Sequence, residues 1–257
     1  MCLILFAYNY HPGYSLALAA NRDEYYERPT AQATFWDDCP DVLAGRDLAA
    51  GGTWLGITRT GRFAALTNYR DPALTVKNPR SRGHLVSDYL CGNLSPGDYM
   101  AMLSKNNSEF NGFNLLAGDS QSLWHYCNIK GTPQRLPPGL YGLSNRFLDT
   151  PWPKVARGKE NMVPCLRSET IDDKELLKLL TDDIPACDSQ LPCTGVGLEW
   201  ERILSPIFIT SATYGTRSST VLTIDLAGTA RFTERTYFAN LRRHQEVVHE
   251  FPFHTSH

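Results

Sequence analysis

The amino-terminal residues combine side chains that could carry out nucleophilic chemistry. Cys2 opens an apolar run, residues 2–7, and the turn pair Pro12-Gly13 separates it from a second apolar run, residues 15–20, which ends in Asn21-Arg22-Asp23-Glu24. Two short apolar runs joined by a Pro-Gly turn are typical of a buried β-hairpin. Because a hairpin brings its outer ends together, we expect the Cys2 thiol to lie beside the two carboxylates, the amide and the guanidinium of residues 21–24.

Removal of Met1, which is usual before a small residue, would give Cys2 a free α-amine beside its thiol. Such an amine has an ordinary pKa of about 7.7–8.0 and can act as a base near neutral pH. We expect Arg22 to lower the pKa values of both groups and Asp23 to orient the amine. With Met1 attached, this chemistry cannot run. The alternative is a small apolar Cys2 in a strand, with residues 21–24 forming a structural ion-pair network.

Composition excludes several classes of function. The chain has 257 residues and a formal net charge of -2, whereas a nucleic-acid-binding protein would present a basic face. No apolar stretch is long enough to span a membrane, and no secretory signal begins the chain. The seven cysteines lack the spacing of a zinc site, and there is no Gly-rich phosphate loop, so we expect no metal and no other cofactor. We expect a single domain over residues 1–257 with reduced thiols, either cytoplasmic or taken into an organelle by another route.

A second hairpin is predicted over residues 51–58 and 62–69. Asn68 closes it, and its amide would lie near Cys2 if the two hairpins meet; such an oxyanion donor contributes about 3 kcal/mol. Asn at a strand end also commonly caps a turn. The pair Gly51-Gly52 permits either a close approach of the backbone to a ligand or entry into a strand where a side chain would clash.

The rest of the chain predicts a mixture of helices and strands. Residues up to about Leu48 are expected to form an irregular loop, and residues 182–201 a lid or an edge loop. The basic run of residues 78–84 either holds an anion of a ligand or is a solvated helix entry. Arg217 enters a strand and needs an anionic partner, from the protein or from a substrate.

The sequence also predicts the remaining secondary structure. The expected helices are 81–90, 96–103, 154–166 and 172–180. The expected strands are 113–118, 122–127, 140–145, 207–210, 214–220, 221–225 and 230–237, with a peripheral strand or disorder over 242–257.

Seven motifs in order resemble the NRDE family, also called the transport and Golgi organisation protein 2 family, over nearly the whole chain. Members of that family are tied to lipid, coenzyme A and haem homeostasis and to secretory-pathway organisation, without an agreed reaction. The motifs are Met1-Cys2-Leu3-Ile4, Ala20-Asn21-Arg22-Asp23-Glu24, Gly51-Gly52-Thr53-Trp54-Leu55-Gly56, Ala65-Leu66-Thr67-Asn68-Tyr69, Asn111-Gly112-Phe113-Asn114-Leu115, Tyr141-Gly142-Leu143-Ser144-Asn145 and Tyr214-Gly215-Thr216-Arg217.

A more distant resemblance concerns mechanism. One ordered set of residues is similar to the active-site set of the N-terminal-nucleophile hydrolases of the choloylglycine hydrolase and penicillin V acylase group. It implies Cys2 as nucleophile and amine base, Arg22 and Asp23 as positioning residues, Asn68 at the oxyanion, Asn145 at the amine and Arg217 as support. Asp23 follows Arg22 directly, whereas that group spaces the two residues a few positions apart, so Glu24 is the alternative to Asp23.

These resemblances imply an α+β fold, a four-layer αββα sandwich of two antiparallel sheets. They also imply a hydrolase that cleaves a non-peptide amide or an acyl thioester through an acyl-Cys2 intermediate. The second hypothesis is a carrier that binds acyl-coenzyme A, a related lipid or haem without a covalent step. In either case we expect substrate contacts from Asn21, Glu24, Trp54 and Tyr69.

Overall fold

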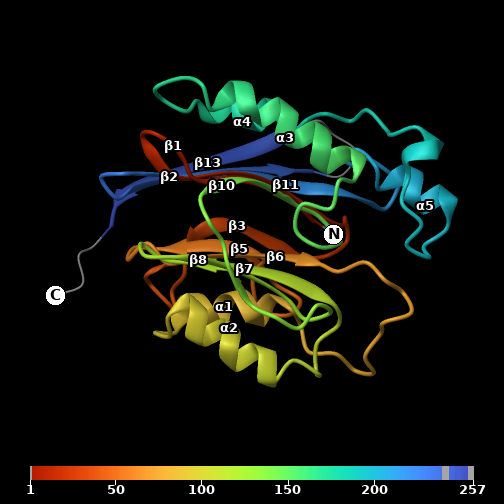
Figure 1. The fold of residues 1–257 in the computed structure, drawn as a ribbon, viewed down its shortest axis with the longest axis horizontal. Helices are drawn as coiled ribbons and strands as arrows, with labels where there is room; N and C mark the ends of the chain where they lie inside the picture. The colour runs from red at the N-terminus through yellow and green to blue at the C-terminus, as the bar shows by residue number, and fades with distance from the viewer. Residues whose placement is uncertain (1, 239–242, 254–257) are drawn as a thin grey trace.

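Two antiparallel β-sheets lie face to face, and helices cover both outer faces (Figure 1). The computed structural model describes residues 2–238 and 243–253. One sheet has six strands, in the spatial order β10 (Gly139–Leu143), β1 (Cys2–His11), β2 (Tyr14–Tyr25), β11 (Tyr214–Asp225), β12 (Thr229–Tyr237) and β13 (His244–Pro252). The other has seven, in the order β3 (Thr30–Phe35), β4 (Val42–Asp47), β5 (Leu55–Thr58), β6 (Phe63–Asn68), β7 (Phe113–Gly118), β8 (Leu123–Cys127) and β9 (Gln134–Arg135).

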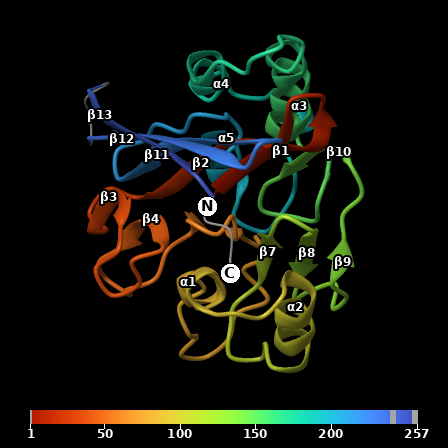
Figure 2. The same ribbon diagram turned by 90° about the vertical axis from the view of Figure 1, so that its left-hand side faces the viewer.

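The helices form the two outer layers of an αββα sandwich (Figures 1 and 2). The helices α1 (Gly83–Cys91) and α2 (Pro96–Lys105) pack on the seven-stranded sheet. The helices α3 (Pro153–Cys165) and α4 (Asp173–Leu179) pack on the six-stranded sheet, and the short α5 (Leu198–Ile203) precedes β11. The predicted α+β four-layer fold and its four main helices are confirmed. In the described ranges, no helix is long and apolar enough to cross a membrane.

The first hairpin is apolar over residues 2–7 and 16–20 because both faces of these two segments are buried. Side chains alternate across a strand, so Ile4 and Phe6 pack between the two sheets while Leu3 and Leu5 pack against α3 and α4. A central strand covered on both faces needs apolar residues at every position, unlike a strand with one solvated face. The hairpin β1–β2 is therefore the centre of the sandwich.

Three predictions of secondary structure differ from the structure. The irregular loop expected up to Leu48 contains β3 and β4, because the irregular backbone is confined to residues 26–29 and to the turn between Phe35 and Val42, and the residues that flank this turn pair as strands. The strand expected over residues 207–210 is reduced to one isolated bridge between Thr210 and Gly215. The two strands expected over 214–225 are one strand, β11, whose pairing with β2 shifts between Thr216 and Ser218.

The segment over residues 182–201 is not a lid over the site described below. Asp182 pairs with Arg157 at 2.6 Å and Glu201 pairs with Arg70 at 2.8 Å, and both pairs anchor the segment beside the six-stranded sheet. None of its residues lines the cavity between the sheets.

At the far edge of the six-stranded sheet, β13 forms the expected peripheral strand, while residues 242 and 254–257 lie outside the described residues.

Candidate active site

A cavity of about 410 Å³ opens between the two sheets at the end where the chain begins. Cys2 and Arg22 belong to its wall on the six-stranded sheet. On the opposite side the wall includes Trp54, Asn68 and Arg82. The structure therefore brings together side chains from both ends of the first hairpin, from the end of β6 and from the segment before α1.

The sheet register sets the shape of one wall. Cys2 is the pairing partner of Arg22, Arg22 of Ser218, and Ser218 of Thr236. Paired residues of adjacent strands point to the same face, and strands lie about 4.8 Å apart, so this row spans roughly 14 Å across four strands. Cys2 stands at one end of the row and Thr236 at the other. The cavity can thus hold an elongated ligand with one end at the thiol.

The Cys2 thiol is buried, with 7% of the residue exposed. Burial raises the pKa of Cys2, the charge of Asp23 adds to this shift, and Arg22 and a hydrogen bond from the Asp23 backbone oppose it. Arg22 lowers this pKa as expected, but loss of hydration outweighs that one neighbouring cation and the net shift is upward. The resting thiol is protonated at neutral pH and needs a base to become a nucleophile.

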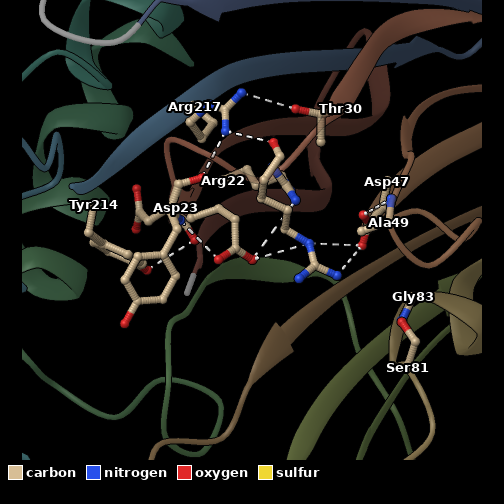
Figure 3. Close-up of polar contacts among 12 residues, drawn as sticks. Arg22, Asp23, Thr30, Asp47, Ala49, Ser81, Gly83, Tyr214 and Arg217 are labelled. Carbon is tan, nitrogen blue, oxygen red and sulfur yellow. Dashed lines mark hydrogen bonds and ion pairs between the residues drawn. The ribbon is translucent and has the colours of Figure 1, made fainter.

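Glu24 lies between two guanidinium groups on the cavity wall. Its carboxylate is 3.9 Å from Arg22 and 3.9 Å from Arg28, longer than hydrogen bonds, while Arg28 pairs closely with Asp47 at 2.6 Å. These contacts are drawn in Figure 3, where Arg22 and Asp47 are labelled. Arg22 therefore keeps only a weak ion pair and can respond to charge on Cys2 or on a ligand.

Asp23 is oriented away from the Arg22 side of the sheet. Its Oδ1 accepts a hydrogen bond from Thr216 Oγ1 at 2.8 Å, and its carbonyl accepts one from Tyr214 Oη at 3.0 Å. Burial raises the pKa of Asp23, whereas Lys154, the Thr216 hydroxyl and Arg22 oppose that shift. The charge of Asp23 contributes to the raised pKa of Cys2.

The two predicted asparagines are in contact, and Asn145 lies farther from the cavity than Asn68. Asn68 lines the cavity, and its backbone carbonyl accepts a hydrogen bond from Asn145 Nδ2 at 2.9 Å. Ser144 Oγ donates to the Cys2 carbonyl at 3.3 Å, and Arg70 N donates to the Asn145 carbonyl at 2.8 Å. Asn145 is fully buried and is not part of the cavity wall, so in this structure its amide fixes the end of β6 beside β1.

The Arg217 guanidinium binds mainly backbone carbonyls. It stands at the register shift of β11, and its guanidinium donates to the carbonyls of Tyr25, Tyr26 and Arg28 at 2.9, 3.0 and 3.0 Å. It also donates to Thr30 Oγ1 at 3.2 Å, as Figure 3 shows. Within the described chain these contacts take the place of a protein carboxylate, and the other expected partner, a substrate charge, stays a prediction. Arg217 thus holds the turn between β2 and β3 while lining the cavity.

Two of the expected substrate contacts lie elsewhere. Asn21 is fully buried on the helical side of the sheet, where its amide donates to the carbonyls of Leu180 and Ile207, both at 2.9 Å. Tyr69 packs against Phe147, with 5.2 Å between ring centroids, and is absent from the cavity wall. Glu24 and Trp54 do line the cavity. A direct substrate contact from Asn21 or Tyr69 has no support here.

The basic run before α1 forms part of the cavity wall, which favours the interpretation that it holds an anion of a ligand, while Arg80 at its start is exposed to solvent. Arg80, Ser81, Arg82 and Gly83 all line the cavity. Arg82 donates to the Gly112 carbonyl at 2.9 Å; burial lowers the pKa of Arg82, and the charges of Cys2 and Glu24 oppose that shift.

Gly52 explains how this run reaches the cavity. A Cβ on Gly52 would lie 2.5 Å from the Gly83 carbonyl carbon, so the glycine allows two backbone segments to approach each other. This resolves the two interpretations of Gly51-Gly52: the close approach at Gly52 is to the start of α1. Figure 3 shows Ser81 and Gly83 on the opposite side of the site from Arg217.

The cavity carries an excess of cationic side chains. Arg82 and Arg217 bind backbone carbonyls and, among the residues that the structure describes, form no ion pair with a carboxylate. One of the acids, Glu234, is fully desolvated, and burial raises its pKa to about 7. The arginines are Arg22, Arg28, Arg46, Arg80, Arg82 and Arg217, and the acids are Asp23, Glu24, Asp47 and Glu234.

Sequence reasoning missed Arg82, Glu234 and the buried Lys154. The basic run was a signal for Arg82, whereas Glu234 and Lys154 are single charges in otherwise ordinary strand and helix patterns. In the described segments, no three His, Cys, Asp or Glu side chains are grouped so that they could hold a metal ion.

Known proteins are similar to this chain in sequence or in fold. The chain is 37% identical over 257 residues to the Transport and Golgi organization 2 homolog of Mus musculus, covering 91% of this chain and 92% of that protein. It is 36% identical over 274 residues to the Homo sapiens homolog, covering 98% and 99% of the two chains.

The fold is that of N-terminal-nucleophile hydrolases. The C2A mutant of conjugated bile acid hydrolase from Clostridium perfringens superimposes with a TM-score of 0.57, covering 99% of this chain and 97% of that one. The two are only 9% identical in sequence, so the likeness concerns the fold alone. The model of the family described as Transport and Golgi organisation 2 matches residues 1–239. The chain therefore belongs to the Transport and Golgi organisation 2 family.

Proposed function

We propose that the chain, once Met1 is removed, is a hydrolase that cleaves an amide or an acyl thioester through an acyl-Cys2 intermediate. The observation that carries this proposal is the position of the Cys2 thiol at the end of a charged cavity, paired with Arg22, in a fold shared with a conjugated bile acid hydrolase. Its raised pKa supports a mechanism in which a base must act on the thiol.

The proposed reaction has two stages. The α-amine of Cys2 takes the thiol proton, the sulfur attacks the substrate carbonyl, and the resulting oxyanion accepts a hydrogen bond at Asn68. The carbon–nitrogen or carbon–sulfur bond then breaks, and the leaving group takes the proton from the α-ammonium. In the second stage the α-amine takes a proton from water, the hydroxide attacks the acyl thioester, and the acid leaves as the Cys2 thiol forms again.

The charges of the cavity favour an anionic acyl compound. Within the described part of the chain, Arg82 and Arg217 bind neutral protein groups and Arg22 keeps an ion pair of 3.9 Å, so each can still bind a carboxylate or phosphate of a ligand. The row from Cys2 to Thr236 fits a substrate whose anionic group lies several bonds from the carbonyl that reacts. This supports a small-molecule amide or acyl thioester as substrate.

The second candidate is a carrier for acyl-coenzyme A, a related lipid or haem. The arginines of the cavity favour it, because they would bind phosphate or carboxylate groups whether or not Cys2 reacts. A protein that retains Met1 could act only in this way. The names of the relatives point to transport and Golgi organisation, and we propose that either activity serves lipid or haem homeostasis there.

Intact-protein mass spectrometry tests the proposal. We would first establish that Met1 is absent, then add short N-acyl amides and acyl thioesters and follow the mass of an acyl adduct. The wild-type protein should form an adduct that maps to Cys2 and should release the free acid, whereas Cys2→Ala should do neither. Cys127→Ala is the matched control, since Cys127 is buried and lies outside the cavity wall.

The outcomes separate the two candidates. Turnover by Cys2→Ala would show that Cys2 is not the nucleophile. A ligand that binds without an adduct, equally to the wild type and to Cys2→Ala, would favour the carrier.

A further inference from the structure

A buried lysine lies on the helical side of the six-stranded sheet, close to Cys2. Lys154 is the second residue of α3 and is only 2% exposed. Among the residues that the structure describes, its Nζ has no hydrogen-bond partner. A buried ammonium group is costly unless an opposite charge compensates it, so the surroundings of Lys154 must supply that charge.

The packing of α3 places Lys154 near the beginning of β1. A Cβ on Gly158 would lie 2.7 Å from Leu5 Cδ1, so the α3 backbone rests directly on β1 at this point. Lys154 precedes Gly158 by about one helical turn. The helix begins near the amino-terminal end of the chain, and Figure 1 shows this end of α3 above the label N. The ammonium therefore belongs to the layer between β1 and α3.

Asp23 reaches the same layer from β2. Side chains alternate along a strand, and Asn21, two residues earlier, points to the helical side, where it binds the carbonyls of Leu180 and Ile207. The Asp23 carboxylate follows Asn21 on that face and accepts its hydrogen bond from Thr216. Asp23 and Lys154 therefore lie on the same side of the six-stranded sheet, where the charge of each acts on the pKa of the other without a direct ion pair within 4.0 Å between these two described residues.

The other charged side chains near Lys154 form an ion pair with each other. Arg70 and Glu201 form a buried ion pair of 2.8 Å, and the Arg70 guanidinium stacks over Trp152 at 4.5 Å. The Tyr214 hydroxyl donates to the Asp23 carbonyl. Burial lowers the pKa of Lys154 to about 8, and the charge of Asp23 is the strongest opposing influence. Lys154 in turn is the strongest charge that opposes the rise in the pKa of Asp23.

We propose that Lys154 is a positioning residue that keeps Asp23 ionised, so that Asp23 can orient and stabilise the α-ammonium of processed Cys2 during the reaction. This inference rests on the proposed hydrolase function. Lys154 touches neither the cavity nor the reacting atoms, and it acts only through Asp23. Without the lysine, Asp23 would take up a proton at a higher pH and lose the charge that the α-ammonium needs.

Three variants test the inference, all in protein from which Met1 has been removed. Lys154→Met removes the charge while keeping the side chain long. Lys154→Arg keeps the charge. Lys159→Met is the matched control, because Lys159 lies on the same helix but pairs with Asp149 at 2.7 Å, on the surface side.

The first readout is the pH profile of turnover. In Lys154→Met the acid limb should move to higher pH by about one to three units, the range by which an opposite charge shifts a pKa. Lys154→Arg should keep the wild-type limb even if its rate falls, and Lys159→Met should match the wild type. A rate that falls equally at every pH in Lys154→Met would reveal a merely structural role and overturn the inference.

The second readout needs no substrate. Carbon-13 NMR of aspartate-labelled protein, assigned with Asp23→Asn, measures the titration of the Asp23 carboxyl directly. The wild type should hold Asp23 ionised at pH 7, and Lys154→Met should raise its midpoint. A wild-type Asp23 that is protonated at pH 7 would overturn the inference even if the variant does not fold. A shifted midpoint without any turnover would instead preserve the Lys154–Asp23 coupling and reject the hydrolase.

Discussion

Cys2 and Arg22 are direct partners across the first two strands of the chain. The ladder between β1 and β2 fixes their backbones, so the guanidinium stands over the same face of the sheet as the thiol without any bond between the two side chains. Arg22 therefore acts on Cys2 through charge, and its replacement changes the electrostatics while leaving the hairpin in place.

Removal of the Arg22 charge should make Cys2 less reactive. Because Arg22 opposes the raised pKa of Cys2, Arg22→Met should raise that pKa further and reduce the thiolate population. We expect alkylation of Cys2 by iodoacetamide at pH 8 to slow by on the order of tenfold. The rate is measured by mass mapping of the Cys2 peptide. Arg80→Met is the control, since Arg80 lines the same cavity but pairs with Glu109; an equal slowing there would contradict a specific effect.

Loss of Arg217 should loosen the turn after β2. Arg217→Met removes the donors to three carbonyls, and charge-assisted hydrogen bonds contribute about 1.5–3 kcal/mol each when isolated. We expect the free energy of unfolding to fall by about 3 kcal/mol in a urea titration. Amide hydrogen exchange should increase first in residues 25–30. Unchanged exchange in this segment would mean that the turn is held by other contacts.

The buried pair Arg70–Glu201 should give a strongly non-additive double-mutant cycle. Arg70→Met leaves the Glu201 carboxylate buried with only Thr194 as a hydrogen-bond donor, which should lower the free energy of unfolding by about 3–5 kcal/mol. Adding Glu201→Met should recover part of that loss, because the second change removes the uncompensated charge. Denaturant unfolding measures all four proteins. Simple addition of the two single losses would show that the pair is not coupled.

Glu234 should make the stability of the fold depend on pH. Its native pKa of about 7 lies above its ordinary value of 4.5, so the native state binds more protons than the unfolded chain between these values. Stability should therefore decline as the pH rises from about 4.5 to 7, by on the order of 2 kcal/mol from this group. Glu234→Gln should remove that decline in melting curves at pH 5 and pH 8. Parallel behaviour of variant and wild type would assign the decline to other groups.

The parts of the fold that depend on local sequence were predictable. The first hairpin, α1 and α2 follow from apolar runs, a Pro-Gly turn and Pro96 at the start of a helix, where Ser95 Oγ accepts from Asp98 N at 3.1 Å. The strands β3 and β4 were not, because Pro40 and the aspartates between them belong to a short turn and mask the paired residues on either side.

The candidate site was predictable only where strand pairing or resemblance connects the residues. Cys2 and Arg22 meet through the hairpin, and Asn68 reaches them because Ser144 and Asn145 tie β6 to β1. Three further charged residues come close to the site only because the layers stack, which brings together residues that are far apart in the chain. They are Arg82, Glu234 and Lys154. No local pattern distinguishes a charge that packing will bury from one that solvent will surround.

The burial of Cys2 at the very start of β1 has a practical consequence for how the protein is produced. An affinity tag or a fusion partner at the amino terminus would keep the Cys2 nitrogen in a peptide bond, and it would require the chain to leave the sandwich beside the cavity. If Cys2 acts through its own α-amine as proposed, such a preparation would give a negative assay for hydrolysis. Recombinant versions meant for enzymology should therefore carry their tag at the carboxyl end and be expressed where methionine aminopeptidase is abundant.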